Sequence, residues 1–405
     1  MKKALNILAF GCLKEITNQI ATQLNTLEIN YNFIDICNYD EIDDILIQKD
    51  LDIIIINKDV ESISYLDFLH KIKESYPYLV RILVADEWSK ELIIKTNNLV
   101  HLIIEKSFMS ETLVDTIIRA IQLQKLLENK NLSRLINSFD ELPIMQNTYI
   151  ELLHLLKSPD VPLKKIADLI AKDYSLTART LQVSNMSIFT HIGRINNVQN
   201  AVVFLGTNVL KAIVLYLQVF NFESENLQAV KTIKALESHS TKVAEFAKTC
   251  AQYYKCSNEI QDHTFTASLL HDIGKFIVVT KTNKWDNITC YAAENGLSIN
   301  QAEKDILGTT HAEIGAYLLN LWGFPTSVVN AVAYHHNPSK AKNNTLGPLT
   351  FVHLSEAFIS GDSLDHEDNI YHYLDLEYLN NVNIDGDLPV LLRLFNYSIE
   401  GAEQQ

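Results

Sequence analysis

Histidines and carboxylates that could bind a metal form an ordered series in the second half of the chain. Nine of the 13 histidines follow residue 238. Imidazole nitrogens and carboxylate oxygens together suit Zn²⁺, Mn²⁺ and Fe²⁺, and side chains from several helices can converge on one point of a helical bundle. The series predicts a site for one or two divalent ions, with Fe, Mn, Zn and Mg all open. The predicted ligands are His239, His271, Asp272, His311, His335, His336 and Glu356.

The pair His271-Asp272 is the centre of this predicted site. Adjacent side chains point about 100° apart around a helix, so both reach one region only near a helix end or with a second metal between them. Gly274 offers such a break. A carboxylate that bridges two metals and helps to activate water can hydrolyse phosphate esters. Lys275 would then steady the phosphate, which makes it the predicted catalytic residue if the chain is a hydrolase.

Each of these residues also has a structural interpretation. A single histidine such as His239 or His311 is commonly an ordinary packed helix residue, and Glu356 is compatible with a surface carboxylate. The alternative to a metal site is therefore a vestigial cluster of packed, hydrogen-bonded histidines. Six histidines outside the series are interpreted as structural or exposed: His154, His191, His263, His353, His366 and His372.

Helices must position these residues, because strand patterns almost vanish after Phe139. Apolar residues recur at helical spacing through most of this region. The larger part of the chain is therefore predicted to be all-α. The predicted helices span residues 151–157, 163–172, 177–184, 198–220, 232–254 and 260–270.

The first 125 residues show a different pattern, in which short apolar runs alternate with amphipathic stretches. This alternation is typical of βα units and predicts a doubly wound α/β domain with a parallel sheet. A continuing helical pattern from Ser110 predicts a linker helix, with a dimer-forming coiled coil as its alternative. The predicted strands are Leu5 to Phe10, Tyr31 to Ile36, Ile53 to Ile56, Arg81 to Ala85 and Leu99 to Ile104.

Composition restricts the classes of function. The chain has 405 residues, a net charge of -15 and 47% hydrophobic residues, which favours a multidomain globular protein and disfavours nucleic-acid binding. The five cysteines form no CxxC pair and no disulfide framework, which favours a reducing compartment. The longest apolar run beyond the amino terminus, Ala212 to Leu217, is too short to cross a membrane. We therefore expect a cytoplasmic protein without membrane insertion.

The N-terminal pattern resembles the receiver domain of response regulators. That resemblance implies an acidic pair, a phosphoacceptor aspartate, a hydroxyl and a lysine at successive strand ends. Here Phe10-Gly11 replaces the acidic pair, Asn57 stands at the phosphoacceptor position, and Val84 or Ala85 replaces the hydroxyl. Only Lys106 matches. The resemblance implies a pseudo-receiver that serves dimerisation, partner docking or domain positioning, with nearby Asp59 and Asp86 as solvated loop residues.

The histidine series resembles the HD superfamily of metal-dependent phosphohydrolases. His239 matches its first histidine and His271-Asp272 its signature pair. His311 and His335-His336 match the extra histidines of the two-metal members. Glu356 stands where the family has its final aspartate, and its side chain is longer by one methylene.

A more specific resemblance, over residues 140 to 360, is to the HDOD family of bacterial signalling proteins. Its motifs are Glu141 to Ile144, Ile170 to Ala178, Leu181 to Ser187, Ile195 to Gly206, and Leu321 to Pro325 followed by His335 to Pro338. The chain departs from the family at Tyr174 and Met186. It also has Asn337-Pro338 where cyclic-di-GMP phosphodiesterases of the related HD-GYP group have Gly-Tyr-Pro.

The HDOD resemblance implies an output or adaptor module without established hydrolase activity. The leading hypothesis is a cytoplasmic signalling adaptor that binds signalling proteins and holds a metal, with homodimerisation through the receiver or linker helix. The alternative is a metal-dependent hydrolase of a nucleotide or phosphate ester. The predicted boundaries are a pseudo-receiver at 1–125, a helical linker at 126–139, the HDOD domain at 140–365 with lobes at 140–222 and 223–365, and a helical extension at 366–405.

Overall fold

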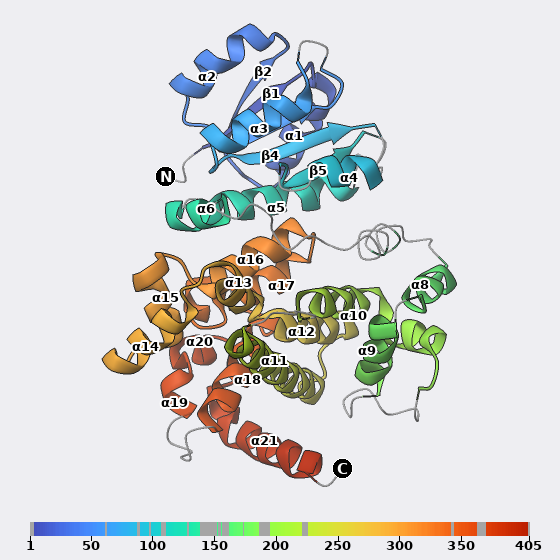
Figure 1. Ribbon diagram of the computed structural model, residues 1–405, viewed down its shortest axis with the longest axis vertical. Helices are drawn as coiled ribbons and strands as arrows, with labels where there is room; N and C mark the ends of the chain where they lie inside the picture. The colour runs from blue at the N-terminus through green and yellow to red at the C-terminus, as the bar shows by residue number, and fades with distance from the viewer. Residues whose placement is uncertain are drawn as a thin grey trace. The chain divides into compact units, whose positions relative to one another are not determined.

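The computed structural model places two compact units. By contacts between Cα atoms, the first comprises Met1–Leu142, Leu307–Thr309 and Asn320–Gly323, and the second Pro143–Ile306, Thr310–Leu319 and Phe324–Gln405. Figure 1 colours the chain from blue to red along its length. The structure describes residues 4–60, 63–86, 90–96, 99–106, 111–127, 129–137, 152, 155, 162–172, 174–185, 195–220, 226–341, 344–362 and 370–403.

The first unit is built on a five-stranded parallel sheet in the order β2-β1-β3-β4-β5, which is the flavodoxin-like order (Figure 1). Its strands are β1 Leu5–Phe10, β2 Tyr31–Ile36, β3 Ile53–Asn57, β4 Val80–Ala85 and β5 Leu102–Glu105. Its helices are α1 Lys14–Thr26, η1 Tyr39–Glu41, α2 Ile42–Gln48, α3 Tyr65–Ser75, α4 Lys90–Thr96, α5 Glu111–Leu127 and α6 Lys130–Asn137.

Buried apolar runs explain why this sheet forms. The four isoleucines of β3 are buried, and only its last residue, Asn57, is partly exposed. A parallel strand covered on both faces needs such an apolar run. One face of the sheet packs on α2, α3 and α4 in a single hydrophobic cluster. All five predicted strands are present. β3 ends one residue later, at Asn57, and β4 begins one residue earlier, at Val80, whereas β5 spans Leu102–Glu105 rather than Leu99 to Ile104. There the amides of Leu99 and Val100 bond to the carbonyl of Thr96, so these residues turn out of α4 before the strand begins.

At the carboxyl edge of the sheet, the residues on which the receiver resemblance rests make contacts with one another and with neighbouring loops. The side-chain amide of Asn57 donates to the carbonyl of Gly11 at 3.0 Å. The ammonium of Lys106 lies 3.0 Å from the carboxylate of Asp59 and 2.8 Å from that of Asp86. The hydrogen bond from Lys106 lowers the pKa of Asp86.

Cys12 and Cys37 form a disulfide next to this edge. The spacing of the cysteines along the chain did not predict this disulfide. The parallel register aligns Phe10 with Ile36, so the residues that follow β1 and β2 come side by side. The observed arrangement is one bridge rather than a framework.

The second unit is helical throughout its described residues (Figure 1). α11, α12, α17 and α18 pack against one another, and α10 packs on α8, α9 and α12. The helices are α8 Leu163–Ile170, α9 Tyr174–Ser184, α10 Val198–Phe220, α11 Leu227–Tyr253, α12 Asn258–Leu270, α13 Ile273–Lys281, α14 Trp285–Asn295, α15 Ile299–Leu307, α16 His311–Leu321, α17 Thr326–Tyr334, η3 Pro338–Ala341, α18 Pro348–Asp362, α19 Ile370–Tyr373, α20 Leu376–Asn381, η5 Asp385–Asp387 and α21 Leu388–Glu403.

Side-chain caps set where several of these helices begin. α11 starts at Leu227, five residues before the predicted start at Thr232, because Asn226 accepts hydrogen bonds from the amides of Gln228 and Ala229. The side chain of Asn185, which directly follows α9, joins the end of that helix to Ile195. Its amide donates to the carbonyls of Leu181 and Ile195 and accepts from the Ile195 amide.

α10 bends at Gly206, which has a φ of 72°. Glycine adopts this left-handed backbone conformation readily, whereas it is strained for other residues. Within the described residues, no single helix has both the length and the hydropathy to cross a bilayer. The segments Val198–Thr207 and Val209–Tyr216 reach that threshold only as a pair, across a bend of 109°. A mostly buried core helix passes the same test, so the pair is weak support for a membrane span.

Several predictions lie outside the described residues. They concern the motif at residues 141–144, most of the helix predicted at 151–157, Asp173, and the segment 186–187 that includes Met186. His154, His191 and His366 also fall there.

Candidate metal centre

Six segments of the helical unit bring the predicted ligands together. His239 lies within α11, His271 ends α12, and Asp272 precedes α13. His311 opens α16, while His335 and His336 follow α17 and Glu356 lies within α18. His271, Asp272, His311 and His335 have no solvent exposure, whereas the side chain of His239 is 23% exposed. The site is therefore buried and opens to solvent on one side.

The helix break predicted at Gly274 occurs earlier, at His271-Asp272 itself. Gly274 lies inside the first turn of α13, so the expectation that it ends the helix is wrong. A Cβ atom at Gly274 would collide with the carbonyl oxygen of His311. Glycine is needed here because two ligand-bearing segments touch through their backbones.

The first group of metal-binding atoms comes from His239, His271 and Glu356. Oε2 of Glu356 lies 2.6 Å from Nε2 of His239 and 3.2 Å from Nε2 of His271. Glu356 is buried to 8% exposure, so its interpretation as a surface carboxylate is wrong. The extra methylene of glutamate still lets the carboxylate reach both imidazoles.

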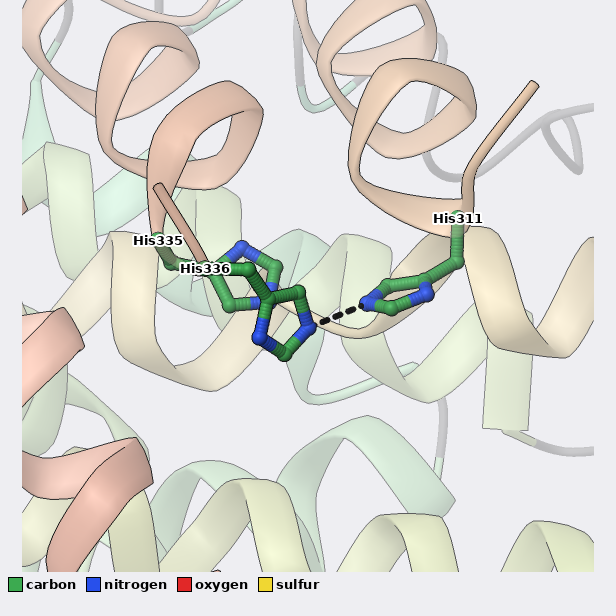
Figure 2. A group of neighbouring side chains, drawn as sticks. All are labelled: His311, His335 and His336. Atoms are coloured by element: carbon green, nitrogen blue, oxygen red, sulfur yellow. Dashed lines mark hydrogen bonds between the residues drawn. The ribbon is translucent and has the colours of Figure 1, made fainter. Parts of the chain in front are cut away.

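The second group comes from His311, His335 and His336, whose rings converge from two directions in Figure 2. Nε2 of His336 lies 3.0 Å from Nε2 of His311. A metal–nitrogen distance of about 2.1 Å places two ligands at right angles about 3 Å apart. The spacing of these two nitrogens thus suits neighbouring ligands of one ion.

Asp272 stands between the two groups and faces each with a different oxygen. Its Oδ2 lies 3.5 Å from Nε2 of His271 and 3.9 Å from Nε2 of His239. Its Oδ1 lies 3.4 Å from Nε2 of His311. Lys275 donates to Oδ2 at 2.7 Å. This is the arrangement of a carboxylate that bridges two ions.

Hydrogen bonds to Nδ1 fix the orientation of two imidazole rings so that Nε2 of each points to the centre of the cluster. Nδ1 of His271 lies 2.6 Å from the carbonyl oxygen of Ser268, and Nδ1 of His335 lies 2.8 Å from that of Val332. A carbonyl can only accept, so each Nδ1 carries the proton and each Nε2 keeps its lone pair. Metal-binding histidines are oriented in this way.

Unsatisfied buried atoms test whether these residues fit a metal. Counting described neighbours only, Nε2 of His335 and Oδ1 of Asp272 make no hydrogen bond, and Nε2 of His271 makes no aligned one. A buried polar atom without a partner costs about 1–3 kcal/mol. All three atoms are lone-pair donors at the centre of the cluster, so a divalent cation would satisfy them together. The donor set fits one or two metal ions.

Comparison with known proteins identifies the domain that carries this site. Residues 142–338 match the family model of the HDOD domain. The helical unit contains an HDOD domain. Six of the seven predicted ligands lie within the matched residues, and Glu356 lies beyond them.

A solved structure supports the HDOD fold. The HDOD domain protein of unknown function from Geobacter sulfurreducens is 21% identical, with a TM-score of 0.55, over 67% of this chain and 95% of its own. A Shewanella amazonensis SB2B protein with the provisional name phosphohydrolase is 23% identical, with a TM-score of 0.49, over 65% of this chain and 93% of its own.

A curated protein of Treponema pallidum (strain Nichols), named "Uncharacterized protein", is also similar. It is 24% identical over 229 residues, which are 55% of this chain and 44% of the Treponema protein. The chain thus spans less than half the length of this curated relative.

The charge states of the HDOD site favour metal binding. Burial alone would raise the pKa of Asp272 and Glu356, but neighbouring imidazoles hold both well below the ordinary carboxyl range, with help from Lys275 at Asp272. Burial and adjacent imidazoles lower the pKa of His335 and His336. His271 is the exception: burial opposes its charge, but the carboxylates of Asp272 and Glu356 raise its pKa, so a metal would have to displace a proton from it. Ionised carboxylates and neutral imidazoles are the forms that bind metals.

Glu303 in α15 is a site residue that the sequence analysis missed. It is fully buried, and its Oε2 accepts from the backbone amide of His311 at 2.8 Å and lies 2.5 Å from Nδ1 of the same residue. It therefore fixes the ring so that Nε2 faces the site. A signal was present, because Glu303 is four residues after Ile299 and three before Ile306, on the apolar stripe of the helix.

His353 supports the site from outside. Its Nδ1 lies 2.7 Å from the carbonyl of His335, and its Nε2 accepts from the amide of Asp375 at 2.9 Å. Both ring nitrogens are thus used in holding the backbone, which agrees with its interpretation as structural. His263 likewise bonds to Ser327 rather than to the cluster.

Proposed function

We propose that the HDOD domain of this chain binds two divalent metal ions and hydrolyses a phosphate ester or nucleotide. One observation carries the proposal. The buried carboxylate of Asp272 presents Oδ2 to the group of His239 and His271. It presents Oδ1, which makes no hydrogen bond within the described residues, to the group of His311. A vestigial cluster of packed histidines gives no reason for the two oxygens of one buried carboxylate to face two different groups of ligands.

Two metal ions bound by these groups would act as Lewis acids, which polarise a phosphoryl oxygen and lower the pKa of bound water. The protein's own residues would do the rest. His239, His271 and Glu356 would hold one ion, and His311, His335 and His336 the other. Asp272 would offer one carboxylate oxygen to each group.

Lys275 is the residue placed to meet the substrate anion. Its ammonium is 2.7 Å from Oδ2 of Asp272, and its side chain is 12% exposed. Burial opposes the charge, but Asp272 and Glu356 raise the pKa of Lys275, so it stays cationic at neutral pH. A fixed cation beside the bridging carboxylate would orient a phosphate and neutralise charge that develops on it.

The proposal is tested by measuring the metal content and the hydrolytic activity of the same protein preparation. Protein purified without chelator or affinity-tag metal should contain one to two equivalents of a transition metal and should hydrolyse a generic phosphodiester such as bis(p-nitrophenyl) phosphate. Asp272→Ala should lose both the metal and the activity, while the exposed control Asp286→Ala should keep both. Metal without turnover on any phosphate ester would reject the hydrolase, and absence of metal would reject the site.

A second candidate function concerns the chain as a signalling adaptor. At the edge of the sheet, Asn57 is bonded to Gly11, and Lys106 is paired with Asp59 and Asp86. An amide cannot form an acyl phosphate, so these contacts favour a pseudo-receiver that binds signalling proteins or a second copy of the chain. Acetyl phosphate with Mg²⁺ should then leave the intact mass unchanged, and partner binding should survive Asp272→Ala.

A further inference from the structure

The disulfide between Cys12 and Cys37 lies in an accessible position at the edge of the parallel sheet. Both cysteines are exposed, and each follows a strand of the parallel sheet, Cys12 two residues after β1 and Cys37 directly after β2. The remaining cysteines differ in their environment: Cys250 is buried, Cys256 is partly buried, and Cys290 is exposed. Only sulfurs that solvent can reach take part readily in thiol–disulfide exchange.

The backbone on the β1 side of the bridge is held in an unfavourable conformation. Gly11 has a φ of 99° and Cys12 a φ of 56°. A left-handed conformation is strained for a residue other than glycine and persists only where its surroundings impose it. The bridge is one such constraint. The hydrogen bonds from Asn57 to the carbonyl of Gly11 and from the Gly11 amide to Ile36 are others.

We infer that Cys12 and Cys37 form a site of reversible thiol–disulfide exchange with low-molecular-weight thiols and their disulfides. In the oxidising direction, the thiolate of one cysteine attacks a small disulfide, RSSR, which gives a mixed disulfide and releases RS⁻. The second cysteine then attacks the mixed disulfide, closes the intramolecular bridge and releases another RS⁻. The two thiol protons end on two RSH molecules, and the cysteines lose the two electrons that the small disulfide gains.

Exchange at this site would act on the sheet edge. Reduction removes the link between the ends of β1 and β2 and allows the strained segment at Gly11 and Cys12 to relax. The carbonyl of Gly11 accepts from Asn57, so the change is passed to the loop after β3. This is the edge where Asp59, Asp86 and Lys106 meet. The two oxidation states would therefore present different surfaces at the carboxyl end of the sheet.

The experiment uses the full chain in glutathione buffers. Protein is equilibrated with reduced or oxidised glutathione, free thiols are alkylated, and each cysteine peptide is quantified by mass spectrometry. Alkylation of Cys12 and Cys37 should fall together, by about tenfold or more, on going from reduced to oxidised glutathione. Cys290 should form at most a mixed disulfide with glutathione and no intramolecular bridge, and Cys290→Ser should leave the paired change intact.

Single substitutions identify the exchange chemistry. In Cys12→Ser, Cys37 should stop at the mixed disulfide and carry one glutathione, and Cys37→Ser should show the same at Cys12. Equal alkylation of both cysteines in the two buffers would overturn the inference. So would a bridge that resists excess thiol in the folded protein, because such a bridge would be permanent rather than exchangeable.

Discussion

The orientation of His311 by Glu303 makes a prediction that separates a metal site from a packed histidine cluster. Glu303→Ala removes an acceptor that lies 2.8 Å from the amide nitrogen of His311 and 2.5 Å from its Nδ1. Hydrogen bonds to a charged group are worth about 1.5–3 kcal/mol each, so the folded state should lose roughly 3 kcal/mol or more. Loss of an outer partner of a ligating histidine typically costs 10–100-fold in metal affinity. We expect this loss only at the group of His311, His335 and His336.

Glu303→Gln distinguishes orientation from simple packing. Glutamine keeps an oxygen acceptor and nearly the same volume but loses the charge. The free energy of unfolding should therefore fall by only about 1 kcal/mol, while the affinity of the second ion should still fall by about tenfold. Asp305→Asn is the matched control, because it makes the same chemical change at an exposed position of the same helix.

The assay is a metal titration against a competing chelator, with stoichiometry measured by mass spectrometry and stability by urea unfolding. Nitrogen-15 spectra of the imidazoles add an independent measurement, since the proton on Nδ1 of His311 should be lost or exchange faster in the variants. If both variants fill two sites with wild-type affinity, Glu303 does not position a ligand. If wild-type protein binds no metal, the failure lies in the proposed site and not in the role of Glu303.

Three further perturbations test other parts of the molecule. Gly274→Ala should lower the free energy of unfolding by about 1–3 kcal/mol and weaken metal binding, because its Cβ would collide with the carbonyl of His311; Gly347→Ala, which meets only one atom at 4.0 Å, is the control in the same urea titration. Replacing Cys12 and Cys37 together by serine should cost the oxidised protein about 3.5 kcal/mol, the entropy of a closed loop with a sequence separation of 25, and should leave the reduced protein unchanged. Burial lowers the pKa of Lys248 from 10.5 to about 8, even though Asp262 opposes that change. Lys248 therefore binds more protons in the unfolded chain than in the native state between these two values, and its contribution to native stability should rise with pH across this window by about 3 kcal/mol. Lys248→Met should be the more stable protein below pH 8, and its advantage over the wild type should shrink by about 3 kcal/mol on going to pH 10.5. A difference between the two proteins in urea unfolding that stays constant from pH 8 to 10.5 would contradict the reasoning.

Several features of the structure could be predicted because local pattern and tertiary environment agree. Strand β3 is an apolar run that ends at a polar residue, and a parallel sheet covered on both faces needs such a run. The series from His239 to Glu356 marks helices that share one centre, and the structure places all seven of these side chains together. Residue types and their order along the chain carry that information.

Other features depend on contacts that spacing does not encode. β5 begins later than predicted because the carbonyl of Thr96 accepts hydrogen bonds from two amides before the strand. α11 begins earlier than predicted because Asn226 caps it. The disulfide depends on the register between β1 and β2, which becomes known only when the strands pair. Glu303 carries a charge on an otherwise apolar stripe, and only its contact with His311 reveals why.

The direction in which the rings are held argues for a working metal centre rather than a relic. In a packed cluster of histidines, the inward nitrogens would be expected to find hydrogen-bond partners, since an unpaired buried atom costs stability. In this HDOD domain the outward nitrogens of His271, His311 and His335 are held by two carbonyls and a buried carboxylate. The inward nitrogens of His271 and His335 and one oxygen of Asp272 lack aligned partners among the described residues. That pattern leaves buried lone pairs that a divalent cation would satisfy. It predicts that adding metal raises the unfolding midpoint of the wild-type protein more than that of Asp272→Ala.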